Sequence, residues 1–248
     1  MTGSIILMSS DLHTNIYMNN TVREIVEFSK QHRLTHVPSA LSMSTYIDTL
    51  FTNRLIVPHR DRIVLGKPFG SQAYYIIWKN NGYMDGVEIS KLSVGVKHDE
   101  ISFVDYGEET MGNALGVAIG IAIANPKQTV WVNITDATLQ MGSTLEAIQY
   151  AGHNKLNNII LTIDNNNCQV TGNTSDVLSI KPAINFISDN MWDTIQCNGH
   201  DQHAIKDLFT VSRSNFPRAY IFDTIKGYGV SYMEEDPIEW HYKIIEDV

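Results

Sequence analysis

The sequence predicts an α/β fold, in which a doubly wound, mostly parallel sheet carries helices on both faces. Residues 129–134 and 158–163 form two apolar, β-branched runs that are typical of buried parallel strands. Each run ends in a polar, turn-forming segment, and a helical pattern at residues 142–151 separates them. Strands that alternate with helices in this way form parallel sheets with right-handed crossovers.

The rest of the chain continues this alternation. Asn20 is a possible helix cap, and glycines at 112, 116 and 120 are typical of a helix packed tightly against a neighbour or a partner subunit. No repeat or linker interrupts the pattern, so residues 21–248 are expected to form one domain, after a possible N-terminal arm at residues 1–20. Further helices are predicted at residues 20–29, 42–52, 110–124 and 204–212, and further strands at residues 194–196 and 219–223.

Composition and charge exclude several classes of protein. The 248 residues are 43% hydrophobic and 18% charged, which suffices for one large domain with a full core. A net charge of −9 without any basic run argues against a nucleic-acid partner. Only two cysteines, Cys168 and Cys197, and no apolar stretch of about 20 residues indicate a cytoplasmic protein without disulfides or a membrane span.

Oxygen-bearing side chains follow both central strands. Asp136 comes directly after the first strand, and Asn166 follows the second. In doubly wound sheets the carboxyl ends of the strands form the ligand-binding edge, and Mg²⁺ prefers carboxylate, amide and backbone oxygens. Asp136 could instead cap the next helix, and residues 165–167 could be turn asparagines, but a cap alone does not require Asn166 on the neighbouring strand.

Five short segments resemble signatures of the N-terminal half of transketolases, in the order that this family shows. The segment from Asp136 to Asn166 is similar to the family's thiamine diphosphate motif, Gly-Asp-Gly followed after a spacer by Asn-Asn. One short match is weak evidence, whereas five in order are strong. The chain therefore resembles the diphosphate-binding (PP) domain of a transketolase-like enzyme of the split type. The other four segments lie at residues 35–39, 60–65, 111–120 and 224–241.

The resemblance implies a thiamine diphosphate-binding fold, the cofactors thiamine diphosphate and Mg²⁺, and a set of site residues. The implied metal ligands are Asp136, Asn166, chosen by counting back from Gly172, and the backbone carbonyl of Cys168, whose side chain is also compatible with a small buried filler. The implied cofactor-binding residues are His36, Met111, Gly112, Asn113, Asp136, Ala137, Thr138, Asn166 and His241.

Three of the nine histidines fall where the family keeps catalytic histidines, namely His36, His98 and His241. His241 has the best motif support, whereas His98 depends on an alignment with a short deletion. As imidazoles they could donate hydrogen bonds to a diphosphate or a substrate oxygen. The other six are interpreted as surface or capping residues: His13, His32, His59, His153, His200 and His203.

The chain departs from the family pattern at several places. Thr135 and Ala137 replace the two glycines beside Asp136, and Ala137 is a mild change only if its φ is negative. Phe69 stands where relatives have a histidine, and Glu108 and Glu109 stand where small residues let the thiazolium ring approach. These changes place ordinary sugar-phosphate ketol transfer in doubt.

Three functions remain open at this stage. The first is the diphosphate-binding subunit of a split transketolase-like transferase that moves a two-carbon unit from a keto substrate. It would act in a heterotetramer with a separate pyrimidine-binding subunit that supplies the activating glutamate. The second is a subunit of another thiamine diphosphate carboligase or 2-oxo-acid decarboxylase, and the third is a non-catalytic relative.

Overall fold

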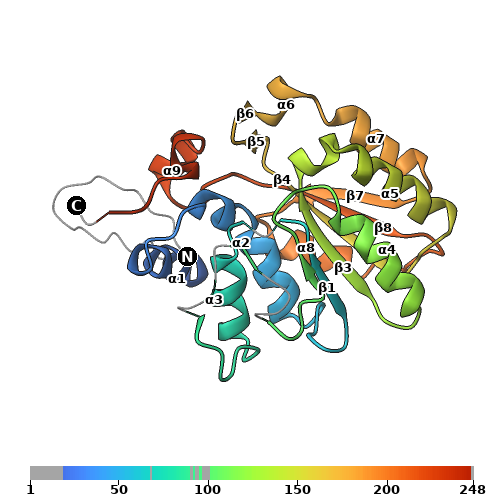
Figure 1. The fold of residues 1–248 in the computed structure, drawn as a ribbon, viewed down its shortest axis with the longest axis horizontal. Helices are drawn as coiled ribbons and strands as arrows, with labels where there is room; N and C mark the ends of the chain where they lie inside the picture. Colours follow the sequence, from blue (N-terminus) through green and yellow to red (C-terminus); the bar gives the residue numbers. More distant parts are fainter. Residues whose placement is uncertain (1–18, 68, 90–91, 93–94, 97–100, 247–248) are drawn as a thin grey trace.

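The computed structural model describes residues 19–67, 69–89, 92, 95–96 and 101–246. In this part of the chain a six-stranded sheet has the order β2-β1-β3-β4-β8-β7, and every neighbouring pair is parallel (Figure 1). The α/β fold expected from the sequence is therefore confirmed. The strands are β1 (Arg62–Leu65), β2 (Tyr106–Gly107), β3 (Val130–Thr135), β4 (Ile159–Asn165), β7 (Asp193–Asn198) and β8 (Arg218–Asp223).

Helices cover both faces of the sheet, and a short antiparallel hairpin follows β4 (Figure 1). The hairpin consists of β5 (Cys168–Gln169) and β6 (Gly172–Asn173). The α-helices are α1 (Asn20–Gln31), α2 (Val37–Thr52), α3 (Gln72–Asn80), α4 (Ala114–Ala124), α5 (Gly142–His153), α6 (Thr174–Val177), α7 (Lys181–Asp189), α8 (Gln202–Leu208) and α9 (Ser231–Glu235). Two 3-10 helices are η2 (Asp136–Gln140) and η3 (Glu239–His241).

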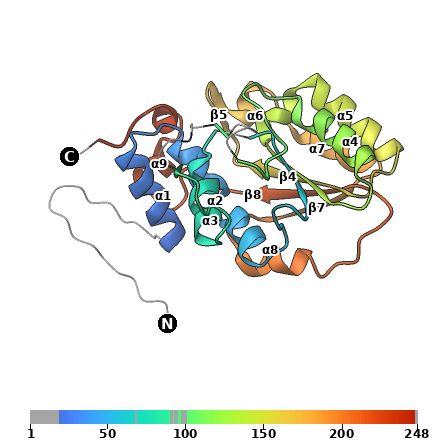
Figure 2. The same cartoon turned by 60° about the horizontal axis from the view of Figure 1, so that its bottom comes forward.

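Side chains that alternate along each strand build two separate cores. In β3, Val130, Val132 and Ile134 join the core under α4, α5 and α7, whereas Trp131 joins the core under α1, α2, α3 and α8. Successive side chains of a strand point to opposite faces, so an unbroken apolar strand fills both cores. Figure 2 shows the resulting three layers, with the sheet between the two groups of helices.

Several helix boundaries differ from those predicted. Helix α2 begins at Val37, with Pro38 in its first turn, instead of residue 42. Helix α4 begins at Ala114 instead of residue 110, because Gly112 takes a φ of +117° that a helix cannot accommodate. The segments that form α3 and α7 were not predicted as helices.

Two further expectations concern the chain's beginning and its glycines. The side chain of Asn19, one residue before the predicted cap, accepts the backbone N–H of Val22, and residues 1–18 lie outside the described residues. No described atom lies within 4 Å of a Cβ built on Gly116 or Gly120. A tight neighbour within the described chain is therefore wrong, and a partner subunit on this helix stays a prediction.

The chain reverses direction within the sheet between β1 and β3. From β1 it proceeds to the edge strand β2, then returns past β1 to form β3. At such a reversal the two adjacent strand ends leave a crevice, which is where open α/β sheets bind ligands. Lys67 after β1 and Asp136 after β3 lie at this point. In the part of the chain that the structure describes, no helix has the length and apolar character to cross a membrane.

Candidate active site

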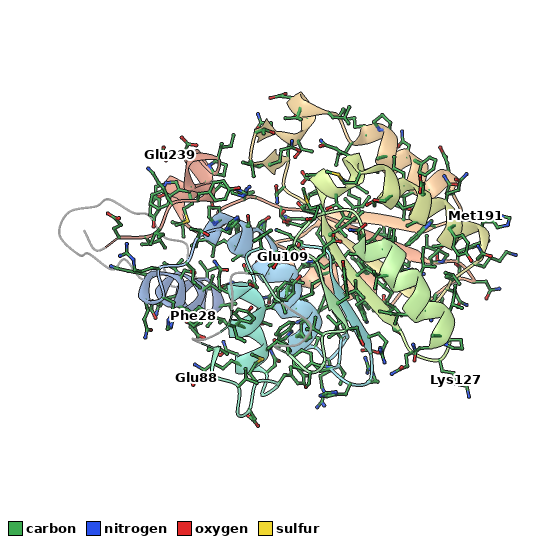
Figure 3. All side chains as sticks on the ribbon, viewed as in Figure 1. Phe28, Glu88, Glu109, Lys127, Met191 and Glu239 are labelled. Atoms are coloured by element: carbon green, nitrogen blue, oxygen red, sulfur yellow. The ribbon has the colours of Figure 1, made fainter. Side chains whose placement is uncertain are left out.

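A cavity of about 440 Å³ opens at the carboxyl end of the sheet. Its wall contains six of the residues predicted from the sequence, which come from segments far apart in the chain. Figure 3 shows Glu109, another wall residue, near the centre of the molecule, whereas Lys127 lies beyond the far end of α4. The six predicted wall residues are His36, Met111, Ala137, Asn166, Cys168 and His241.

Asp136 is fully buried where β3 meets η2. Its Oδ1 accepts hydrogen bonds from the Thr135 hydroxyl at 2.9 Å and from the Ala137 N–H at 2.8 Å. Its Oδ2 has no hydrogen-bond partner among the described residues. Burial, followed by the nearby Asp164 carboxylate, raises the pKa of Asp136. An unsatisfied buried carboxylate oxygen is costly without a cation, so this atom suits a metal.

Asn166 is the asparagine of its run that faces the cavity. Asn165 donates to the Asp223 carboxylate at 2.7 Å on the outside, and Asn167 takes a left-handed φ of 52°. The Asn166 Oδ1 accepts the Cys168 N–H at 2.9 Å, which leaves a second lone pair for a ligand. Cys168 lies in the same wall. Asp136, Asn166 and Cys168 thus offer the carboxylate, amide and carbonyl oxygens that Mg²⁺ prefers.

The altered residues next to Asp136 fit their positions without strain. Ala137 lies within the 3-10 helix η2, where φ is negative, so the loss of a glycine is mild. Thr138 is buried below the cavity surface, and its hydroxyl finds no partner in the described structure. It lies close to the site without lining the cavity.

Glu108 changes the interpretation of the segment before α4. Its carboxylate accepts the N–H groups of Gly112 at 3.1 Å, Asn113 at 2.9 Å and Ala114 at 2.7 Å. These are N–H groups that a helix start leaves unpaired, and the carboxylate also complements the helix dipole. Glu108 therefore closes the start of α4, and neither Gly112 nor Asn113 reaches the cavity wall.

Asp164 was interpreted from the sequence as a turn residue, and this is wrong. It is the sixth residue of β4 and is fully buried. Its carboxylate pairs with the buried Lys67 ammonium and accepts hydrogen bonds from Ser42 at 2.8 Å and Thr224 at 2.5 Å. Burial alone would raise the pKa of Asp164, but the Lys67 ammonium and these donors hold it below its usual range.

His36 and His241 lie together, with ring centroids 4.7 Å apart. His36 precedes α2 with a left-handed φ of 61°, an unfavourable conformation that is common at functional sites. The Lys226 ammonium lies 2.9 Å from Nδ1 of His241 and donates to it. Burial and the Lys226 charge lower the pKa of His36 to about 4 and that of His241 to about 3, so both are neutral at pH 7. His98 lies outside the described residues.

His200 was interpreted as a surface or capping residue, and this is also wrong. Its half-buried ring stacks on Tyr228 with centroids 3.6 Å apart. Its Nε2 accepts the backbone N–H of Ile225 at 2.8 Å, so it supports the loop that carries Lys226. Burial lowers the pKa of His200 to about 4.

These histidines predict a loss of stability in acid. Between pH 6.5, the ordinary pKa of histidine, and about pH 4, the unfolded chain binds more protons than the folded chain. The free energy of unfolding should therefore fall as the pH is lowered through this window. His200→Gln keeps an acceptor for Ile225 and should make this decline shallower in urea unfolding at pH 7 and pH 5. The exposed His203→Gln is the control, and equal declines in both variants would contradict the assignment.

Phe69 forms an aromatic wall with its neighbours. Its ring stacks on His36 with centroids 4.9 Å apart, and Tyr242 meets the same imidazole edge-on at 5.1 Å. Phe69 is 38% exposed, and both aromatic residues line the cavity. The wall is therefore apolar at the place where a histidine was expected from the resemblance.

Two lysines of the cavity wall were not predicted from the sequence. Lys67 and Lys226 are both buried, and burial lowers the pKa of Lys226. Both residues lie inside segments that carried the resemblance or departed from it, but an isolated lysine gives no signal of burial. Their two ammonium groups make the cavity suitable for an anion.

Most of the chain matches a family of known proteins. A family model described as "Transketolase, thiamine diphosphate binding domain" matches residues 18–241. One of the two chains of an apulose-4-phosphate transketolase from Actinobacillus succinogenes is 32% identical over 77% of this chain and 73% of its own. Its counterpart in Phocaeicola vulgatus is 25% identical over 90% and 85%. Mus musculus transketolase is 27% identical over 75% of this chain but only 31% of its own length.

Solved structures show the same fold. Transketolase from Campylobacter jejuni superposes with a TM-score of 0.76 at 20% identity, over 91% of this chain and 39% of that one. Transketolase from Leishmania mexicana gives a TM-score of 0.75 at 20% identity, over 85% and 36%. The chain thus corresponds to rather more than a third of each of these longer proteins.

Proposed function

Because the chain belongs to the transketolase family through its thiamine diphosphate-binding domain, we propose that it is the diphosphate-binding subunit of a split transketolase-like enzyme. The enzyme transfers a two-carbon unit from a keto donor to an acceptor. Two relatives of similar length are themselves named as single subunits of a transketolase, which supports a division of the enzyme between two chains. The observation that carries the proposal is the unpaired Asp136 oxygen beside Asn166 and Cys168, within the part of the chain that the structure describes.

The residues of the cavity divide into two groups. Asp136, Asn166 and the Cys168 carbonyl hold Mg²⁺, and the Lys67 and Lys226 ammonium groups offset the charge of a diphosphate. When bound, thiamine diphosphate supplies the nucleophilic carbon that carries the transferred fragment.

The two histidines act as hydrogen-bond donors. Lys226 donates to Nδ1 of His241, so the neutral ring carries its proton on Nε2. His241 can therefore donate from Nε2 to a phosphate or substrate oxygen, and neutral His36 can do so from one ring nitrogen. Neither imidazole holds a proton to release at pH 7 as a cation, so both orient and polarise instead of acting as strong acids.

A second partner chain completes the site in this proposal. The pyrimidine-binding subunit supplies the remaining cofactor contacts, and two copies of each chain form a heterotetramer with twofold symmetry. Native mass measurement of the co-expressed pair should give a 2:2 assembly. A 1:1 complex at assay concentration would remove the heterotetramer. We place the assembly in the cytoplasm, in keeping with two cysteines that are both free.

The isolated chain should bind thiamine diphosphate and Mg²⁺ weakly or not at all, because the partner's contacts are missing. Adding the partner chain should restore tight binding in calorimetry and permit turnover of a keto substrate. Equally tight binding by the chain alone would contradict the split arrangement. Binding without turnover of any keto substrate would favour the non-catalytic alternative.

Phe69 favours a second candidate within the same chemistry. A phenyl ring offers no hydrogen bond, and each substrate hydroxyl buried against it without a partner costs about 1–3 kcal/mol. The aromatic wall suits a less hydroxylated donor or acceptor, such as a short 2-oxo acid or a deoxy sugar. The alternative is thus a subunit of another thiamine diphosphate carboligase or 2-oxo-acid decarboxylase.

The variant Phe69→His tests this specificity. We expect the unmodified complex to use ketose phosphates poorly, and Phe69→His to raise their kcat/KM relative to a 2-oxo acid by about 10-fold, the factor for 1.4 kcal/mol. Competition assays between xylulose 5-phosphate and pyruvate measure the ratio. Tyr242→Phe, which keeps the aromatic wall, is the control. Efficient use of xylulose 5-phosphate by the unmodified complex would return the protein to ordinary ketol transfer.

A further inference from the structure

Asp164 connects the buried cations of the site to the amide of Asn166. One carboxylate oxygen, Oδ2, receives the Lys67 ammonium and, at 2.7 Å, the Nδ2 of Asn166. The other, Oδ1, receives the hydroxyl groups of Ser42 at 2.8 Å and Thr224 at 2.5 Å. The carboxylate is fully buried, so solvent does not compete for these positions.

This arrangement allows only one orientation of the Asn166 amide. With Nδ2 toward Asp164, the amide oxygen points to the Cys168 N–H at 2.9 Å and toward the cavity. The reversed amide would place its oxygen 2.7 Å from a carboxylate oxygen and its NH₂ group against the Cys168 N–H. Both contacts would be repulsive, because acceptor would face acceptor and donor would face donor.

We propose that Asp164 is a positioning residue for Asn166, which directs the amide oxygen to the cation site. Lys67 is the second part of this device, since its ammonium keeps the carboxylate charged and therefore able only to accept. Lys67 also donates to the Ser39 carbonyl at 3.0 Å, which ties the pair to α2. The inference rests on the proposed function, in which Asn166 is a metal ligand.

The simpler interpretation is that Lys67 and Asp164 form only a structural ion pair. The two can be separated with Asp164→Asn and with Lys67→Met combined with Asp164→Asn. An amide at 164 can donate to Asn166 as well as accept, so the reversed Asn166 amide becomes allowed. In the double variant no ammonium is left unpaired, but the constraint on Asn166 is still missing.

The experiment uses the complex with its partner chain, and Mn²⁺ serves as a probe in place of Mg²⁺. Free Mn²⁺ is followed by electron paramagnetic resonance at saturating thiamine diphosphate, and unfolding by urea is measured in parallel. Asp223→Asn is a matched control, because Asp223 accepts from Asn165 at the same distance of 2.7 Å but on the exposed side. It should leave Mn²⁺ affinity unchanged.

We expect Asp164→Asn to weaken Mn²⁺ binding by about 10- to 100-fold, as loss of a residue that orients a metal ligand usually does. The double variant should recover stability but not Mn²⁺ affinity. Recovery of both would overturn the positioning role and leave a structural ion pair. If the unmodified complex binds no Mn²⁺, the proposed metal site itself fails, and the inference fails with it.

Discussion

Replacing Asp164 with alanine should destabilise the folded chain by about 3–5 kcal/mol, because the Lys67 ammonium then remains buried without its counter-charge. Both partners are almost fully excluded from solvent, with side chains 7% and 0% exposed. The hydroxyl groups of Ser42 and Thr224 lose their acceptor in the same change. Removing one member of a buried pair is far more costly than removing both.

Urea unfolding of the isolated chain at pH 7 measures this effect. Lys67→Met combined with Asp164→Ala should recover much of the loss, since no buried charge remains. Asp223→Ala is the control at the end of the neighbouring strand and should change stability by no more than about 0.5 kcal/mol, because its side chain is exposed. A single variant no less stable than the double variant would contradict the role of the ion pair.

Asp136→Ala should abolish the metal-dependent part of cofactor binding in the complex. Loss of a residue that only orients a ligand already weakens metal binding by about 10- to 100-fold, so loss of the ligand itself should cost at least about 100-fold. The folded chain without cofactor should tolerate this change better than Asp164→Ala, because the Asp136 Oδ2 has no partner to lose among the described residues. The two aspartates are therefore expected to show opposite patterns of damage.

Calorimetric titration of the complex with thiamine diphosphate, with and without Mg²⁺, measures the metal-dependent part. Asn166→Ala should resemble Asp136→Ala. Cys168→Ala should change affinity by less than about 3-fold, because only its backbone carbonyl is asked to coordinate and a free buried cysteine acts mainly as a small apolar side chain. An Asp136→Ala complex that still requires Mg²⁺ for tight binding would show that the metal lies elsewhere.

Boundaries and partners of buried polar groups could not be predicted from local patterns. Glu108 closes the start of α4 through a turn made possible by the positive φ of Gly112, and neither feature has a periodic signal. His200 depends on an N–H donor 25 residues away and on the ring of Tyr228. The sequence shows these side chains as polar, and polar side chains are exposed by default.

The fold and the place of the candidate site, in contrast, could be predicted from short stretches of chain. Apolar strands and amphipathic helices are specified by side chains a few residues apart, so β3, β4 and α5 could be predicted within about two residues. Asp136 and Asn166 could be located because each follows a buried strand, and parallel strands end at the same edge of a sheet. The family resemblance depends on short segments in the same way.

The role of Asp164 became visible only in the folded molecule, where it is a buried anion instead of a turn residue. Its partners Lys67 and Ser42 lie 97 and 122 residues away in the sequence. The charge state of a buried carboxylate depends on which groups the fold brings within a few ångströms of it, and no local pattern encodes that distance.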